Sequence, residues 1–214
     1  YVLTQFKSQS LYLHMKKGWN VSGITNRFID IIPAQMRDGK RWYEGTADAI
    51  YQNIVFVEQS GAADVCIFGS DHVYKMDIRQ MLEFHLRKQA KLTVAALRMP
   101  RSEASKFGVI EVDGEGKMIG FEEKPENPKS IPGEPDWCLV SMGNYIFKST
   151  VLCDELREDA VNPESSHDFG KDIIPKMFSD GGVYVYDFSQ NKIKGEIETT
   201  YWRDVGTIES YWSA

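Results

Sequence analysis

The stretch Asp64-Val65-Cys66-Ile67-Phe68-Gly69-Ser70-Asp71-His72 decides the fold, because it joins a short apolar run to a glycine and then to a carboxylate. A continuous apolar run of this length, bounded by turn residues, is typical of a buried strand in a parallel sheet. In open α/β sheets, ligands bind beyond the carboxyl ends of the strands, so Asp71 stands where a functional side chain is expected. An aspartate that only caps a helix or lies in a solvated loop would give the same pattern.

Strand and helix patterns alternate on both sides of this stretch. We expect strands at Arg27–Pro33, Lys91–Met99, Leu139–Phe147 and Val183–Tyr186, and helices at Ser8–Lys17, Thr46–Val57, Asp77–Gln89, Ser149–Glu158 and Asp168–Ser179, with Thr46 as an N-cap and a turn at Asp38–Lys40. Residues 108–121 form a β-hairpin pattern that turns at 113–116. We therefore predict one α/β domain over residues 1–214: a mostly parallel sheet with an inserted β-hairpin and helices on both faces.

Composition excludes several classes of protein. The net charge of -6 is spread over 214 residues and forms no basic stripe, so we expect no nucleic-acid partner. No apolar stretch reaches the roughly 18 residues that cross a bilayer, so we expect no membrane partner and a cytoplasmic protein. Cys66, Cys138 and Cys153 lie in apolar runs without a CxxC pair, which favours buried thiols over a metal or redox site.

Glycines near the hairpin do not predict a dinucleotide site. Gly114, Gly116 and Gly120 have the spacing GxGxxxG and no helix pattern follows them, so they are better interpreted as turn residues. The sequence also lacks the HExxH, GxSxG and GxxxxGK[ST] motifs.

Three further places combine polar groups with the end of an element. Lys124, in Phe121-Glu122-Glu123-Lys124-Pro125, could neutralise a phosphate, although a solvated strand end has the same composition. Asp204 follows Trp202-Arg203 and could be a second metal ligand or half of a structural ion pair. The Gly45-Thr46 helix start could receive ligand hydroxyls or phosphate, or could be an ordinary cap.

Seven motifs, in this order, resemble one enzyme family. They are WYEGTADA, FGSDHVYKMD, FGVIEVD, FEEKPENP, VSMGNYIF, SSHDFGKDIIP and YWRDVGT, and they extend across nearly the whole chain. Together they resemble the catalytic domain of bacterial ADP-glucose pyrophosphorylases, the glucose-1-phosphate adenylyltransferases. The resemblance implies a Rossmann-like nucleotidyltransferase fold and the Mg²⁺-dependent reaction of ATP with α-D-glucose 1-phosphate to give ADP-glucose and pyrophosphate, towards glycogen.

The resemblance also implies roles for particular residues. Asp71 and Asp204 would hold one Mg²⁺ ion, and Lys124 would grip the phosphate of glucose 1-phosphate. Further positions would line the glucose 1-phosphate pocket: Tyr43, Gly108, Glu123 and Ser141. Asp168 and Lys171 match the motif HDFGKD, where pocket support is the implied role. Gln5 and Trp42 match a region that transmits allosteric activation in the family.

The family pattern includes two parts that this sequence lacks. One is an N-terminal glycine-rich loop that holds the nucleotide phosphates, and the other is a C-terminal left-handed β-helix domain that helps to build a homotetramer. We therefore expect the 214 residues alone to bind ATP weakly and to turn over slowly, and the longer enzyme to be a homotetramer.

Two alternatives stay open on sequence alone. A nucleotidyltransferase that makes dTDP-, UDP- or GDP-sugars would share the EKP motif and the metal-binding aspartate, although WYEGTADA and SSHDFGKD favour the adenylyl enzyme. A non-catalytic regulatory subunit is the other alternative, and the presence of Asp71, Lys124 and Asp204 argues against it.

Overall fold

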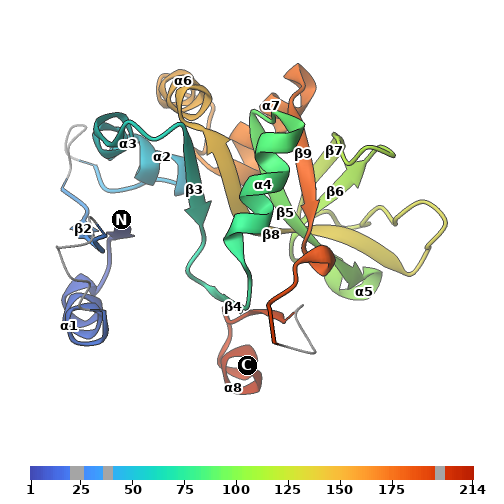
Figure 1. Ribbon diagram of the computed structural model, residues 1–214, viewed down its shortest axis with the longest axis horizontal. Coiled ribbons are helices and arrows are strands. Elements are labelled where there is room, and N and C mark those ends of the chain that lie inside the picture. The colour runs from blue at the N-terminus through green and yellow to red at the C-terminus, as the bar shows by residue number, and fades with distance from the viewer. Residues whose placement is uncertain (20–26, 36–40, 196–200) are drawn as a thin grey trace.

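A six-stranded sheet forms the centre of the computed structural model, which describes residues 1–19, 27–35, 41–195 and 201–214 (Figure 1). Its order is β7-β6-β8-β5-β9, and β3 pairs with β8 beside this path. The strands are β3 (Asp64–Phe68), β5 (Leu92–Pro100), β6 (Gly108–Val112), β7 (Met118–Glu123), β8 (Trp137–Lys148) and β9 (Val183–Asp187). The predicted α/β class and the inserted hairpin, formed by β6 and β7, are confirmed.

The long strand β8 decides how the sheet is paired. It runs antiparallel to β3, β5 and β6, while β5 and β9 are parallel neighbours. Thus β3, β5, β6 and β9 share one direction, as expected for a mostly parallel sheet, but most hydrogen-bonded neighbours in it are antiparallel. The sequence predicted strand β8 correctly but not its insertion between β3 and β5, because strand direction is set by long-range pairing and not by composition.

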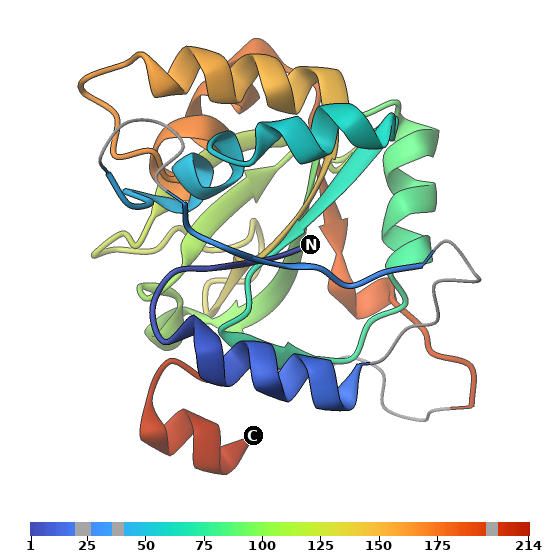
Figure 2. The ribbon, with the colours of Figure 1, turned by 90° about the vertical axis from the view of Figure 1, so that its left-hand side faces the viewer.

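Helices cover both faces of the sheet, as predicted. On one face, α2 (Thr46–Tyr51), α6 (Ser149–Ala160) and α7 (Ile174–Asp180) pack on Leu92, Val94 and Ala96 of β5. On the other face, α4 (Ile78–Lys88) packs on Ala95 through Met81. This alternation along β5 buries the strand on both sides. In Figure 2, α3 (Ile54–Ser60) runs beside α6, to which the Arg157–Glu58 ion pair joins it.

Smaller elements lie outside the main sheet (Figure 1). β1 (Val2–Thr4) pairs in parallel with β2 (Ile31–Pro33), next to α1 (Ser8–Gly18). At another end, β4 (His72–Tyr74) pairs antiparallel with β10 (Trp202–Asp204), which leads to α8 (Ile208–Ser213). The remaining elements are the short α5 (Arg101–Ala104), a π-helical turn at Phe169–Ile173 and a 3₁₀ turn at Phe188–Gln190. Within the described ranges, no helix is both long and apolar enough to cross a bilayer.

Several local predictions were wrong. The helix expected from Thr46 to Val57 is interrupted at Gln52 and Asn53, and its N-cap is Gly45, because the Thr46 hydroxyl hydrogen-bonds with the loop at Asp168 instead. Only Ile31–Pro33 of the strand expected at Arg27–Pro33 is extended, since pairing with β1 reaches no further. The turn expected at Asp38–Lys40 lies outside the described residues. The strand expected at 64–68 forms, but it pairs antiparallel with β8 and none of its residues is buried, so the buried parallel strand predicted there is wrong. The other predicted helices and strands agree within a few residues, except that the helix expected from Asp168 begins with the π-helical turn.

The burial of one cysteine was also predicted wrongly. Cys138 and Cys153 are buried, but Cys66 is exposed. It lies on β3, which pairs only with β8 among the described strands and is therefore covered less than a central strand. An apolar run identifies a strand but does not say whether that strand lies at the centre or the edge of a sheet.

Candidate functional site

Asp71 and Asp204, far apart in sequence, meet at the small sheet formed by β4 and β10. The register places Asp204 opposite His72, and the backbone N–H of Val205 donates to the carbonyl oxygen of Asp71 at 2.9 Å. The Asp71 side chain is 78% exposed, so its carboxylate is open to a ligand. One oxygen of Asp204 accepts from the backbone N–H of Gly206 at 3.3 Å, which leaves the other oxygen of this carboxylate available.

This donor set suits a metal ion that is shared with a substrate. Among the described residues, no cluster of three or more histidine, cysteine, aspartate or glutamate side chains could form a metal cage. Mg²⁺ is commonly held by one or two carboxylates, with waters and substrate phosphates in the other positions. The pair Asp71 and Asp204 therefore fits Mg²⁺ bound together with a phosphate ligand.

A second group of candidate residues gathers where the hairpin ends. Gly108 of β6 is paired with Glu123 of β7, and a Cβ at Gly108 would lie 2.5 Å from the Phe121 ring and 3.0 Å from a Glu123 oxygen, so only glycine fits. Lys124 follows in the left-handed conformation, with φ of 48°, and its backbone N–H donates to the Phe107 carbonyl oxygen at 3.1 Å. Its side chain is 63% exposed, with the ammonium 3.6 Å from Glu123. A positive charge is thus presented to solvent at the strand end.

The loop before the π-helical turn brings Asp168 to the same place. The Asp168 carboxylate accepts from the backbone N–H groups of Gly170 and Lys171 at 2.9 and 3.2 Å, and from the Thr46 hydroxyl at 3.0 Å. A Cβ at Gly170 would lie 2.8 Å from a Glu123 oxygen, so the two segments touch. Burial raises the pKa of Glu123, Lys124 opposes this shift, and the Asp168 charge adds to it.

Tyr145 of β8 lies near both groups of candidate residues, the Asp71 group and the Glu123–Asp168 group. Burial raises its pKa to about 12; a hydrogen bond with Ser141 opposes the shift, and the charges of Asp168, Glu123 and Asp71 add to it. The phenol therefore lies within electrostatic reach of carboxylates from both groups. Tyr145 was not predicted as a site residue, although its position four residues after Ser141 on one strand was a usable signal, because such residues share a face.

Ser141 itself is buried at the same strand. Its hydroxyl oxygen accepts from the backbone N–H of Gly143 at 3.2 Å. Of the positions predicted for the sugar phosphate (Gly108, Glu123, Lys124 and Ser141), Ser141 and Glu123 lie close enough to Tyr145 to affect the pKa of its phenol.

Tyr43, Gln5 and Trp42 form a separate group near the start of α2. Tyr43 and Gln5 exchange two hydrogen bonds, of 2.7 Å and 3.4 Å, through the Gln5 amide and the Tyr43 backbone. The Tyr43 hydroxyl accepts from Asn53 at 2.8 Å, and the carbonyl oxygen of Trp42, whose side chain is 49% exposed, accepts from Gln52 at 3.5 Å. Gln5 thus contacts the segment that carries Trp42, and the hydrogen bonds described for Tyr43 go to Gln5 and Asn53 and not to the Lys124 group.

Two cavities lie away from these candidate residues. One, of about 590 Å³, is lined by Arg41, Glu44 and residues of the 160–167 segment, and the other, of about 510 Å³, lies between the hairpin and the 130–134 loop. Neither is lined by Asp71, Lys124 or Asp204. Asp71 and Lys124, whose side chains are 78% and 63% exposed, follow the ends of β3 and β7.

Paired carboxylates and an exposed lysine at the strand ends of an α/β sheet are the features of a phosphate-handling enzyme. Residues 1–214 match the nucleotidyl transferase family over their whole length, and the chain belongs to that family.

Curated relatives make the likeness more specific. Over its full length the chain is 80% identical to glucose-1-phosphate adenylyltransferase 1 of Vibrio cholerae and 74% identical to the glucose-1-phosphate adenylyltransferase of Aliivibrio fischeri, and it covers 53% of each. It is also 50% identical, over 52% of the relative, to the protein of that name from Anaeromyxobacter dehalogenans. The chain therefore spans about half the length of the curated relatives it matches.

Proposed function

We propose that the chain is the catalytic part of a glucose-1-phosphate adenylyltransferase. This enzyme would convert ATP and α-D-glucose 1-phosphate to ADP-glucose and pyrophosphate. The observation that carries the proposal is the convergence of the Asp71 and Asp204 segments at the β4–β10 pair, where the partly buried Tyr145 lies near Asp71, Glu123 and Asp168. The names of the relatives support the choice of substrates.

Different residues would bind the two substrates. Asp71 and Asp204 would hold Mg²⁺, which neutralises the triphosphate charge when bound. Lys124 would neutralise the phosphate of glucose 1-phosphate, because its ammonium is exposed at the end of β7. Glu123 and Ser141 would accept hydrogen bonds from, or donate them to, sugar hydroxyls, with Gly108 allowing the close approach and Asp168 supporting this wall.

No protein nucleophile is needed for this reaction. An oxygen of the sugar phosphate forms a bond to the α-phosphorus of ATP, and the bond from that phosphorus to the oxygen bridging to the β-phosphate breaks, so pyrophosphate leaves. Positioning and charge neutralisation supply the rate enhancement in such phosphoryl chemistry. The residues that would carry out this chemistry lie beside the middle of β8, which pairs there with the end of β3 and the start of β6.

A direct assay tests the proposal. Glucose 1-phosphate is incubated with each nucleoside triphosphate in turn, with Mg²⁺ and then with EDTA, and pyrophosphate release is measured. The assay uses both the 214-residue chain and a chimera in which the chain replaces the matching segment of the Vibrio cholerae relative. We expect ATP to be strongly preferred, EDTA to abolish turnover, and the chain alone to be much slower than the chimera.

Three other results of this assay would contradict the proposal or one of its expectations. Preference for dTTP, UTP or GTP would overturn the adenylyl assignment in favour of another sugar nucleotidyltransferase. No turnover by the chimera with any nucleotide would favour a regulatory subunit. Near-normal turnover by the chain alone would contradict the expectation that the nucleotide is held mainly by segments outside it.

Four further properties stay predictions from the family resemblance. They are a role towards glycogen, a cytoplasmic location, a homotetramer for the longer protein, and transmission of an allosteric signal through Gln5 and Trp42. The two hydrogen bonds between Gln5 and the backbone of Tyr43, next to Trp42, support the last of these.

A further inference from the structure

His72 occupies the position between the two candidate metal ligands. It follows Asp71 in sequence and is paired across the β4–β10 ladder with Asp204. Its side chain is only 4% exposed, although the neighbouring Asp71 side chain is 78% exposed. The chain thus buries an imidazole next to an open carboxylate, and the contacts of this ring define what it can do.

Both ring nitrogens of His72 have polar partners. Nδ1 lies 3.3 Å from an Asp71 oxygen, and Nε2 lies 2.8 Å from the side-chain oxygen of Asn144 on β8. Asn144 is fully buried, and its amide nitrogen makes no hydrogen bond of normal geometry among the described residues. Burial raises the pKa of Tyr74, and the nearby Asn144 amide opposes this shift. The central strand of the main sheet is therefore connected, through one imidazole, to the carboxylate that would bind metal.

The proton position on the ring follows from these partners. A carboxylate only accepts hydrogen bonds, so the contact with Asp71 requires the proton on Nδ1. Nε2 of the neutral ring is then an acceptor, and an Asn144 amide turned with its nitrogen towards the ring satisfies both Nε2 and the buried amide nitrogen. With its nitrogen turned towards the ring, Asn144 selects the tautomer that donates to Asp71.

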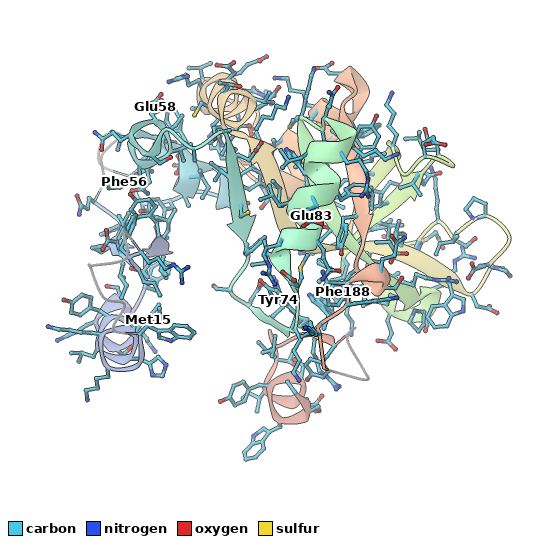
Figure 3. All side chains as sticks on the ribbon, in the orientation of Figure 1. Met15, Phe56, Glu58, Tyr74, Glu83 and Phe188 are labelled. Carbon is cyan, nitrogen blue, oxygen red and sulfur yellow. The ribbon has the colours of Figure 1, made fainter. Side chains whose placement is uncertain are left out.

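Aromatic contacts fix the plane of the same ring. The His72 ring packs against Tyr74 and Trp202, with centroid distances of 5.0 and 5.9 Å. Trp202 lies two residues before Asp204, on the same face of β10 as Asp204, and Tyr74, labelled in Figure 3, is its partner across the ladder. Fixing the ring therefore also fixes the strand that carries the second carboxylate.

The space around the ring is limited by two glycines. A Cβ at Gly69 would lie 2.9 Å from the His72 ring and 3.1 Å from an Asp71 oxygen, and one at Gly143 would lie 3.7 Å from the ring. Gly69 thus allows the ring and the Asp71 carboxylate to lie side by side at the end of β3.

We propose that His72 is the positioning residue of the metal site: its Nδ1–H holds the Asp71 carboxylate in one orientation, and Asn144 holds the ring in the required tautomer. The inference rests on the proposed function only in assigning Asp71 and Asp204 as metal ligands. Hydrogen-bond partners behind metal ligands fix ligand orientation, and their removal commonly costs 10- to 100-fold in metal affinity.

Three substitutions separate the hydrogen bond from the packing. His72→Asn keeps an N–H near the Nδ1 position, and His72→Gln keeps a polar group near Nε2 only. His72→Phe keeps the aromatic ring without either polar contact. His14→Asn on the exposed face of α1 is the matched surface control.

The probe is Mn²⁺ alone, and its binding to the 214-residue chain is measured from the free-ion electron paramagnetic resonance signal. We expect His14→Asn to equal the unsubstituted chain, His72→Asn to bind within about threefold of it, and His72→Gln and His72→Phe to bind roughly tenfold more weakly. Wild-type-like binding by His72→Phe, or equal losses in the Asn and Gln variants, would overturn the proposal in favour of a packing role.

Two further measurements complete the test. Nitrogen-15 shifts of the histidine rings report the tautomer without any substitution at His72, and a proton on Nε2 of the neutral ring would contradict the assignment. Asp71→Asn should abolish most Mn²⁺ binding. If it does not, the metal assignment of the proposed function fails; if it does while all His72 variants bind normally, only the inference fails.

Discussion

Substitution of Gly45 by alanine tests the close contact between the start of α2 and the segment that leads to Asp168. Gly45 is the N-cap of α2 and has an extended backbone, with φ of -157°, that alanine can adopt. A Cβ there would lie 2.1 Å from the carbonyl oxygen of His167 and 2.5 Å from that of Ser166, both backbone atoms. The obstacle is therefore steric contact between two main chains and not backbone strain.

The loss of stability follows from the backbone shift that the added Cβ requires. Ordinary contact needs about 3.4 Å, so the His167 carbonyl has to shift by more than 1 Å. This carbonyl accepts the backbone N–H groups of Ala47 and Asp48 at 2.8 and 3.3 Å, so the shift also breaks the cap of α2. Overpacking costs about 1–3 kcal/mol, and a lost cap costs about 1 kcal/mol more. For a chain of this size, about 2–4 kcal/mol lowers Tm by roughly 4–16 °C.

The assay is thermal unfolding with a glycine control. Gly114→Ala in the hairpin turn places a Cβ in open space, with nothing within 4 Å, and should leave Tm unchanged or slightly higher. Because Asp168 directly follows His167, Gly45→Ala should also raise the KM for glucose 1-phosphate more than that for ATP in the chimera. A Gly45→Ala chain that melts within about 1 °C of the unsubstituted chain would refute the steric reasoning.

Two further substitutions and one change of pH should alter turnover, KM or stability in a defined direction. Asp71→Asn should lower turnover at least about 100-fold while Tm stays within a few degrees, because its side chain is exposed; loss of cooperative unfolding would instead indicate a structural carboxylate. Lys124→Ala should raise the KM for glucose 1-phosphate roughly 10- to 100-fold with little change for ATP, and equal effects on both would count against its role. Burial lowers the pKa of His85, with Asp64 opposing, so the unfolded chain binds a proton more readily. The contribution of His85 to stability should therefore be fully present above the unfolded pKa of about 6.5 and should be lost as the pH falls below it. His85→Gln should flatten the dependence of Tm on pH between about pH 7.5 and 5.5. If the slope of Tm against pH is unchanged in this variant, His85 does not cause the loss of stability.

The candidate site was partly visible in the sequence. Asp71 was chosen as a candidate because a carboxylate shortly after an apolar strand run is a local pattern, and Lys124 because it follows a hairpin strand. Tyr145 and His72 were missed as members of the site, since their importance depends on neighbours from other segments. Thr46 was taken as a cap because threonine favours that position, but a tertiary hydrogen bond with Asp168 took its hydroxyl.

Sequence by itself determined most of the helices and the longer strands, because side-chain periodicity and turn residues act over short distances. It also determined the chemical groups that stand at the strand ends. Only the tertiary structure decided that β8 inserts antiparallel between β3 and β5, and that β10 returns to pair with β4. Those pairings depend on backbone hydrogen bonds between residues distant in the chain, which composition does not specify, and they place Asp204 beside Asp71 with His72 between them.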